Sequence, residues 1–159
     1  MQRAQAGFTI VELMTVMVIV GILAVLAIPA FGDQLARRRL EGAATDLSTD
    51  LQFARSQAVA KGLIHRIRTT STTTYVIDHL DAGGTPVVPV DKTVPLPANI
   101  TISNGIVVAY DSMRGAASSA QTLALASTQT SATMQVDVNL MGRANLCSPS
   151  GSLKGYPQC

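Results

Sequence analysis

The stretch GFTIVE at residues 7–12 leads directly into an apolar segment at residues 13–31, and this junction decides the architecture of the chain. The segment carries no charged residue and, at roughly 20 residues, is long enough to span a bilayer. Glu12 stands at its head. A carboxylate at the edge of a membrane span costs roughly 2 to 3 kcal/mol on insertion scales, so its presence indicates a function and requires a positively charged partner.

Residues 7–12 resemble the N-terminus of type IV pilins and type II secretion pseudopilins, in which a short leader ends in Gly and is followed by Phe, with Glu five positions into the mature chain. The resemblance implies that residues 1–7 are a leader, which prepilin peptidase removes between Gly7 and Phe8 on the cytoplasmic side. It also implies that Phe8 is N-methylated. Residues 8–31 are then retained, first as a transmembrane helix in the bacterial inner membrane and later as a fibre core.

The same resemblance supplies a partner for Glu12. Cleavage creates an α-amino group on Phe8, which is cationic near neutral pH. A staggered pair between Glu12 and the Phe8 amine of a neighbouring subunit would favour one axial register, because an unpaired charge in the fibre core is penalised by several kcal/mol. We therefore assign Glu12 a role in assembly.

Two alternatives for the apolar segment remain open. In an ordinary signal anchor, Glu12 would merely lie near the lipid headgroups. In a secretory signal peptide, cleavage would follow the apolar run, but Pro-Ala-Phe-Gly at residues 29–32 is better interpreted as a kink. Arg3 precedes the segment and three arginines follow it at residues 37–39. By the positive-inside rule, these charges alone would place the N-terminus outside the cytoplasm. The expectation that the N-terminus is cytoplasmic and the remainder periplasmic therefore comes from the resemblance.

Composition agrees with one small exported domain on a membrane stem. The chain has 159 residues and a net charge of +2, which gives no general electrostatic argument for binding nucleic acid. Aromatic residues make up 4% and Trp is absent, so an aromatic platform for stacking bases is not expected.

Beyond the kink, a helical pattern of small and apolar residues predicts an amphipathic helix at residues 32–62. Together with residues 8–31 it forms one helix of about 50 residues, bent or broken near Pro29 and Gly32. We expect the helix to end at Lys61 and Gly62, which place a cation in the last turn and a glycine after it. The residues expected on the face that packs on a sheet are Leu40, Ala44, Leu47, Leu51, Ala54 and Ala58.

From residue 63 onward the pattern changes to short β-like runs between Gly, Pro, Ser and Thr clusters. The expected fold class is therefore α+β, with a long N-terminal helix packed on antiparallel sheets and a β-rich head at residues 63–159. The stretch at residues 82–97 has four prolines and predicts a loop or an edge hairpin. The expected strands lie at residues 63–68, 74–79, 100–103, 106–110, 122–126 and 132–138.

The two cysteines, Cys147 and Cys159, match no metal-ligand spacing. In an exported domain we expect them to form a disulfide that closes a small C-terminal loop, as in pilins, and that contributes about 3 kcal/mol. Free reactive thiols are the alternative. They would require an activating neighbour, and Lys154 is the only cation within the loop.

Two further segments narrow the resemblance to the subfamily of GspH pseudopilins and FimT and FimU minor pilins. Residues 50–62 resemble its helix end, and residues 139–147 resemble its last strand. DNA-binding FimT proteins carry a Gly-Arg pair followed by a second basic residue, whereas here Gly142 and Arg143 are followed by Asn145. Arg143 and Lys154 are the remaining candidates for DNA binding, and each missing phosphate contact weakens such binding. The favoured alternative is a turn with a solvated or carboxylate-paired guanidinium.

Catalysis, a metal and a cofactor are not expected. His65 and His79 are isolated and lack the spacing of a zinc site, and neither a nucleophile elbow nor a phosphate-binding loop is present. Asp78, His79 and Asp81 could be imagined as acid-base groups, but polar residues at a strand end simply meet solvent.

The resemblance favours a minor pilin of a type IV pilus, which assembles with other pilin or pseudopilin subunits through its N-terminal helix, near the fibre tip. One alternative is the H-type minor pseudopilin of a type II secretion system. The other is a DNA-binding minor pilin for natural transformation.

Overall fold

The computed structural model describes residues 8–149, 151 and 153–159, with the side chains of residues 26–30 left out. The predicted leader at residues 1–7, including Gly7, lies outside the described residues. The chain divides into two compact units, residues 1–35 and 36–159, which are described separately.

In the first unit, helix α1 (Ile10–Lys61) begins directly after Thr9. The backbone N–H of Glu12 donates to Thr9 Oγ1 at 3.2 Å, so the Thr9 side chain caps the helix. Glu12 also lies in the first turn, where the helix dipole favours a negative charge. The described backbone of α1 continues through Pro29 and Gly32 as one helix, so of the two predicted alternatives, a bend or a break, the break is wrong.

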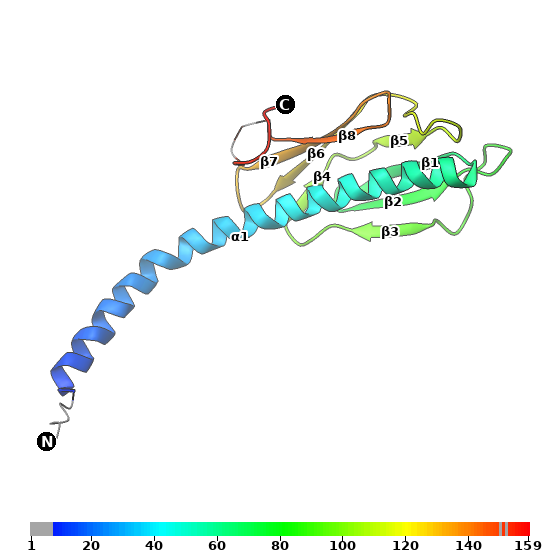
Figure 1. Ribbon diagram of the computed structural model, residues 1–159. Helices are drawn as coiled ribbons and strands as arrows, with labels where there is room; N and C mark the ends of the chain where they lie inside the picture. Colours follow the sequence, from blue (N-terminus) through cyan, green and yellow to red (C-terminus); the bar gives the residue numbers. More distant parts are fainter. Residues whose placement is uncertain (1–7, 150, 152) are drawn as a thin grey trace, which may run out of the picture. The chain divides into compact units, whose positions relative to one another are not determined.

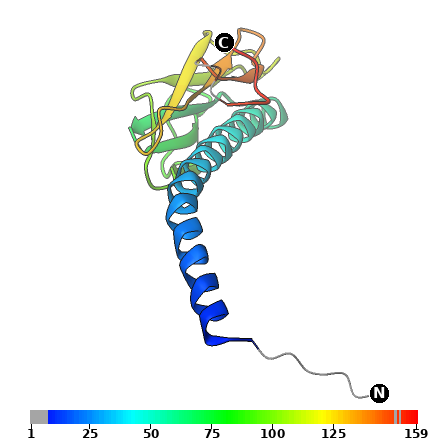
Figure 2. The ribbon, with the colours of Figure 1, turned by 90° about the vertical axis from the view of Figure 1, so that its left-hand side faces the viewer.

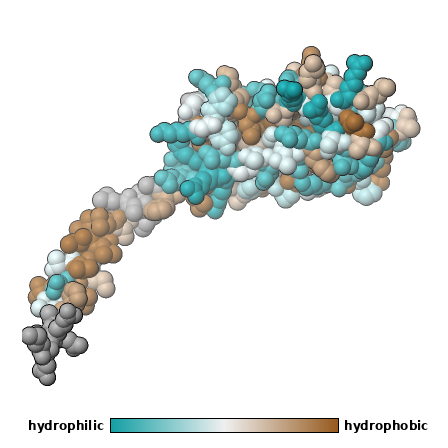
Figure 3. Space-filling model, in the orientation of Figure 1, coloured by the Kyte–Doolittle hydropathy of each residue, from teal (hydrophilic) through white to brown (hydrophobic). Residues whose placement is uncertain are grey.

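The first unit presents an apolar surface. Phe8 is 83% exposed, Ile10 79% and Val25 71%, and other large apolar side chains between them are also exposed. Figure 3 shows hydrophobic residues gathered along this part of the helix, whereas the visible face of the head mixes hydrophilic, intermediate and hydrophobic residues. Among the residues whose side chains are described, no helix combines the length and apolar character needed to cross a membrane.

In the second unit, the rest of α1 buries one face against the head. Leu40, Ala44, Leu47, Leu51, Ala54 and Ala58 are all fully buried, which confirms the predicted packing face. The helix ends at Lys61, and Gly62 follows with a φ of +65°, a left-handed conformation that favours glycine. The predicted helix end is therefore confirmed.

Two four-stranded antiparallel sheets make up the rest of the head (Figures 1 and 2). The first has the strand order β3-β2-β1-β5 and the second the order β4-β6-β7-β8. One hydrophobic core contains residues of the helix and of both sheets. The strands are β1 (His65–Ser71), β2 (Thr74–His79), β3 (Lys92–Pro95), β4 (Ile100–Ile102), β5 (Val107–Tyr110), β6 (Gln121–Ser127), β7 (Thr133–Val138) and β8 (Ala144–Cys147).

The six predicted strands are present within a few residues of their expected bounds. The remaining two described strands are both at sheet edges. The stretch at residues 82–97 contains β3, which pairs with β2 and confirms the edge-hairpin alternative. β8 pairs with β7 across the connection that contains Gly142 and Arg143.

Candidate functional sites

The N-terminal assembly candidates, Phe8 and Glu12, are both exposed in the first unit. Glu12 is thus a carboxylate on a helix surface that is otherwise lined by Ile10, Val11, Leu13 and Met14. Burial of this surface in a lipid or protein environment would desolvate the Glu12 charge, which is why a cationic partner is required.

The helix-end segment and the Gly-Arg segment, which the sequence places far apart, meet in the head. Arg55, on α1, donates its Nε–H to the carbonyl oxygen of Gly115 at 2.9 Å. Gly142 packs against the same group, because a Cβ on Gly142 would lie 2.2 Å from the Gly115 oxygen and 3.0 Å from Arg55 Nε. Only a glycine fits there, and its φ of +76° imposes the same requirement.

Arg55 and Gly142 both line a shallow basic pocket of about 540 Å³. Arg55 is half-buried in it, whereas Arg114 and Arg143 are exposed at its edge. Arg143 lies in the connection between β7 and β8, where its N–H donates to Asn139 Oδ1 at 3.0 Å. Lys154, the other predicted DNA-binding residue, is exposed and is not among the described residues that line this pocket. The sequence had offered Lys154 as the second cation beside Arg143, whereas the structure places Arg114 beside the same pocket.

Several contacts attach the described part of the C-terminal loop to the head. Cys147 and Cys159 form a disulfide with an S–S distance of 2.06 Å, as expected from the sequence. Ser148 donates its N–H to the Pro157 carbonyl at 2.9 Å. The Leu153 side chain is only 3% exposed and belongs to the core of the head. The loop is therefore part of the packed structure.

A buried acid on α1 connects the helix to the first sheet. Asp50 Oδ2 accepts the hydroxyl of Tyr75, on β2, at 2.8 Å, and Asp50 Oδ1 accepts Lys92 Nζ, at the start of β3, at 2.8 Å. Burial of the Tyr75 ring, followed by its hydrogen bond to Asp50, raises the pKa of the Tyr75 hydroxyl well above its usual range. Asp50 thereby fixes the β2–β3 hairpin on the helix.

A second buried acid lies in the first sheet. Asp78 is 1% exposed and accepts hydrogen bonds from Arg66 and Arg68 on β1, the latter at 2.8 Å between Arg68 Nε and Asp78 Oδ2. Asp78 therefore serves as the shared counter-ion of two arginines. The expectation that it simply meets solvent at a strand end is wrong, because cross-strand pairing places Arg66 directly opposite it.

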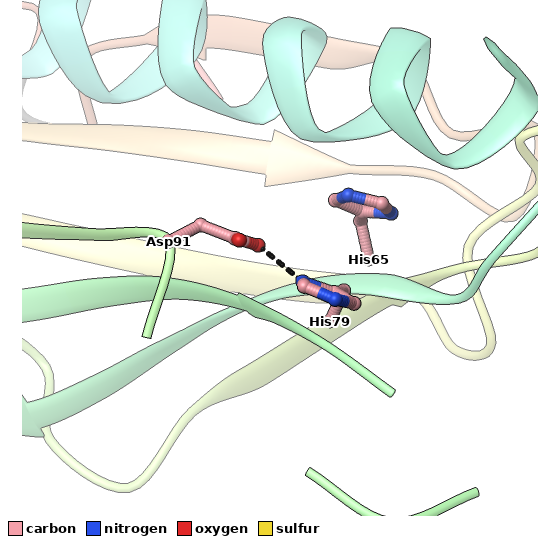
Figure 4. A group of neighbouring side chains, drawn as sticks. All are labelled: His65, His79 and Asp91. Atoms are coloured by element: carbon pink, nitrogen blue, oxygen red, sulfur yellow. Dashed lines mark hydrogen bonds and ion pairs between the residues drawn. The ribbon is translucent and has the colours of Figure 1, made fainter. Parts of the chain in front are cut away.

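The two histidines are adjacent in space although they are isolated in the sequence. His65 and His79 pair across β1 and β2, and their rings stack with a centroid separation of 5.2 Å. His79 Nδ1 lies 2.8 Å from Asp91 Oδ2 (Figure 4). The sequence pattern did not indicate this group, because strand register, rather than residue spacing, brings its members together.

Comparison with known proteins places this geometry in a family. The prokaryotic N-terminal methylation motif matches residues 2–28, and the type II transport protein GspH matches residues 43–142. A fimbrial protein of Pseudomonas aeruginosa is 37% identical over 113 residues, which cover 65% of this chain and 73% of that protein. A fimbrial protein of Moraxella nonliquefaciens is 43% identical over 66 residues, covering 37% of this chain and 43% of that protein.

Solved structures share the helix-and-two-sheet architecture. The type IV minor pilin FimU of Pseudomonas aeruginosa superposes with a TM-score of 0.60 at 20% identity, covering 74% of this chain and 95% of FimU. The minor pseudopilin EpsH of Vibrio cholerae superposes with a TM-score of 0.56 at 14% identity, covering 70% of this chain and 98% of EpsH. The fold is thus that of minor pilins and pseudopilins. With the GspH match spanning residues 43–142, the chain belongs to the GspH family of type II transport proteins.

Proposed function

We propose that this chain is a minor pilin of a type IV pilus, an assembly subunit without catalytic activity. Prepilin peptidase cleaves it between Gly7 and Phe8, and Phe8 is then N-methylated. The helical segment at residues 8–31 anchors the precursor in the bacterial inner membrane, with the head at residues 63–159 in the periplasm. The anchor later packs against other pilin subunits in the fibre, near its tip.

The observation that carries this proposal is the exposed apolar surface of the first unit, with Glu12 placed in it. Large apolar side chains such as Ile10, Leu13 and Val25 are more than half exposed. A continuous surface of this kind requires a lipid or protein partner, because exposed apolar area is costly in water. In a fibre, the Phe8 amine of a neighbouring subunit would neutralise Glu12 and set the axial register.

Processing is tested by expressing the full chain with and without prepilin peptidase and measuring the mass of its N-terminal peptide. The expected product begins at Phe8 and carries one additional methyl group. An uncleaved N-terminus in the presence of an active peptidase that processes a control pilin would reject the proposal.

Assembly is tested by comparing Glu12→Gln with Glu41→Gln, since Glu41 is the other glutamate of the chain and lies in the same helix. We expect Glu12→Gln to be cleaved normally but to be depleted from sheared surface fibres, whereas Glu41→Gln is incorporated. The H-type pseudopilin alternative predicts instead that deletion abolishes protein secretion and leaves surface pili intact.

A second candidate function, DNA capture, is favoured by one observation. Arg114 and Arg143 are both exposed beside the same pocket, so Arg114 supplies a second cation there, although Asn145 replaces the second basic residue of the FimT pattern. Two adjacent guanidinium groups are able to contact neighbouring phosphates, which gives binding that weakens with salt.

This candidate is tested by a DNA gel shift with the full chain in detergent micelles at two salt concentrations. If the chain captures DNA, Arg114→Ala and Arg143→Ala each weaken binding, and each lowers the salt slope by about 0.9 per lost phosphate contact. Lys154→Ala tests the other predicted cation, and Lys61→Ala serves as a control because Lys61 lines a different pocket. Absence of any shift at low salt would leave assembly as the sole function.

A further inference from the structure

We propose that His65, His79 and Asp91 form a binding site for a divalent transition-metal ion of the zinc type, which would fix the β2–β3 hairpin to β1. One ring nitrogen from each histidine and one carboxylate oxygen from Asp91 lie within 4.8 Å of one another. Two imidazoles and a carboxylate form a ligand set that zinc and similar ions use in proteins, with the fourth position open to water.

The state of the His65 ring is the main support. Its Nδ1 lies 3.1 Å from the Leu63 carbonyl oxygen, which only accepts hydrogen bonds, so Nδ1 carries the proton. Nε2 is then left with a free lone pair. His65 is 1% exposed, and Nε2 has no hydrogen-bond partner among the described residues. A buried acceptor without a partner is costly, and a metal ion would satisfy it while the Leu63 carbonyl orients the ring.

The other two groups lie on the side from which an ion would enter. His79 and Asp91 have side-chain exposures of 20% and 29%, and Figure 4 shows the two histidine rings stacked with Asp91 directed toward His79. Ligand atoms on a tetrahedral zinc ion are about 3.3 Å apart. The three donor atoms, all within 4.8 Å of one another, approach this spacing, and the partly exposed His79 and Asp91 are the side chains that would rotate toward an ion.

The two lysines near this group do not prevent a cation from binding there. His65 and Asp91 line a pocket of about 340 Å³ that also contains Lys61 and Lys92. The Lys92 ammonium is held by Asp50, at 2.8 Å, and Lys61 is exposed to solvent, where its charge is screened. Neither lysine is therefore needed as a counter-ion by Asp91, and its carboxylate is available to ligate the metal ion.

Occupancy would have a structural consequence. Asp91 directly precedes Lys92, the first residue of β3, and the segment at residues 80–91 connects β2 to β3. An ion bound to Asp91 and to both histidines would hold this connection against β1. We therefore expect metal binding to slow hydrogen exchange in residues 80–91.

The test uses the full-length chain without a polyhistidine tag, oxidised at its disulfide, freed of metal with a chelator and kept in detergent micelles. Calorimetric titration with Zn²⁺ is expected to show one saturable ion per chain. Binding should weaken in acidic solution, because protonated imidazole does not ligate metal. Hydrogen exchange with and without Zn²⁺ gives the second readout.

Variants locate the ion. His79→Gln and Asp91→Asn should each lower zinc affinity at least tenfold and abolish the added exchange protection, whereas the control Asp46→Asn, an exposed acid on α1, should leave both unchanged. His65→Gln should have the same effect as His79→Gln. If this buried variant does not fold, the variants at the partly exposed His79 and Asp91 are enough to locate the ion. The proposal is overturned if Zn²⁺ shows no saturable binding, or if His79→Gln and Asp91→Asn bind it as the unchanged chain does.

Discussion

Arg55 donates its Nε–H to the carbonyl oxygen of Gly115 at 2.9 Å, a bond that joins helix α1 to a loop 60 residues away. Gly142 lies against both groups and admits no side chain. Two loops, one before β6 and one before β8, are therefore attached to the same point of the helix. This contact positions Arg114 and Arg143 beside one pocket.

Replacing Arg55 by Met tests the bond, because Met keeps much of the apolar stem but has no donor. We expect a loss of about 1 to 2 kcal/mol in the free energy of unfolding, since the Gly115 carbonyl loses its partner in a largely buried position. Urea unfolding followed by circular dichroism measures the change. Arg114→Lys, at the exposed edge of the same pocket, should change stability by less than about 0.5 kcal/mol. Equal effects of the two substitutions would contradict the role given to Arg55.

Gly142→Ala should be markedly more destabilising than Gly105→Ala. Both glycines have a φ of +76°, so both variants suffer the left-handed backbone penalty of about 1 to 2 kcal/mol. The new Cβ meets open space at Gly105 but lies 2.2 Å from a backbone oxygen at Gly142. We expect an additional loss of about 2 kcal/mol or more at Gly142, measured by urea unfolding. A difference close to zero would show that the Gly115 loop moves freely.

Removing the hydroxyl groups of two buried tyrosines should affect stability differently. Tyr75→Phe deprives Asp50 of a donor and should cost about 1 to 2 kcal/mol. The Tyr110 hydroxyl is buried without a hydrogen-bond partner among the described residues, so Tyr110→Phe should be neutral or stabilising. Thermal unfolding of the two variants provides the comparison, and a clear loss of stability in Tyr110→Phe would reveal a partner for that hydroxyl.

Stability should decline in alkaline solution. Burial raises the pKa of Tyr110 to about 12, although Arg55 acts in the opposite direction, and the pKa of Tyr75 is raised further. Because the folded chain holds these protons more tightly than the unfolded chain, the contribution is complete below about pH 10, the unfolded pKa. It falls by about 1.4 kcal/mol per pH unit for each tyrosine above that value, and the Tyr110 part is lost as the pH passes about 12.

Urea unfolding at several values above and below about pH 10 measures this decline. A Tyr156→Phe background leaves Tyr75 and Tyr110 as the only tyrosines, since the chain has three. Tyrosinate absorbance should then appear together with unfolding. Its appearance in the folded chain near pH 10 would contradict the raised pKa values.

Local patterns were sufficient to predict most elements of the fold. The apolar spacing from Leu40 to Ala58 depends on the helical repeat alone, and Gly62 ends the helix by its own backbone freedom. The edge strand β8 was harder to predict from the sequence, because the short run before Cys147 becomes a strand only when β7 supplies its hydrogen bonds. In the β3 segment, the prolines indicated an edge without showing which residues pair.

The sequence by itself therefore determined a long helix with an apolar N-terminal half, a β-rich head and a cysteine pair, because these features depend on residues near one another in the chain. Only the tertiary structure decided that Asp50 meets Lys92, that Arg55 meets Gly115 and that His65 and His79 lie beside Asp91. Such contacts depend on strand register and on how the helix lies on the sheets. A shift of one residue in strand register would turn His65, His79 or Lys92 to the opposite face of the sheet.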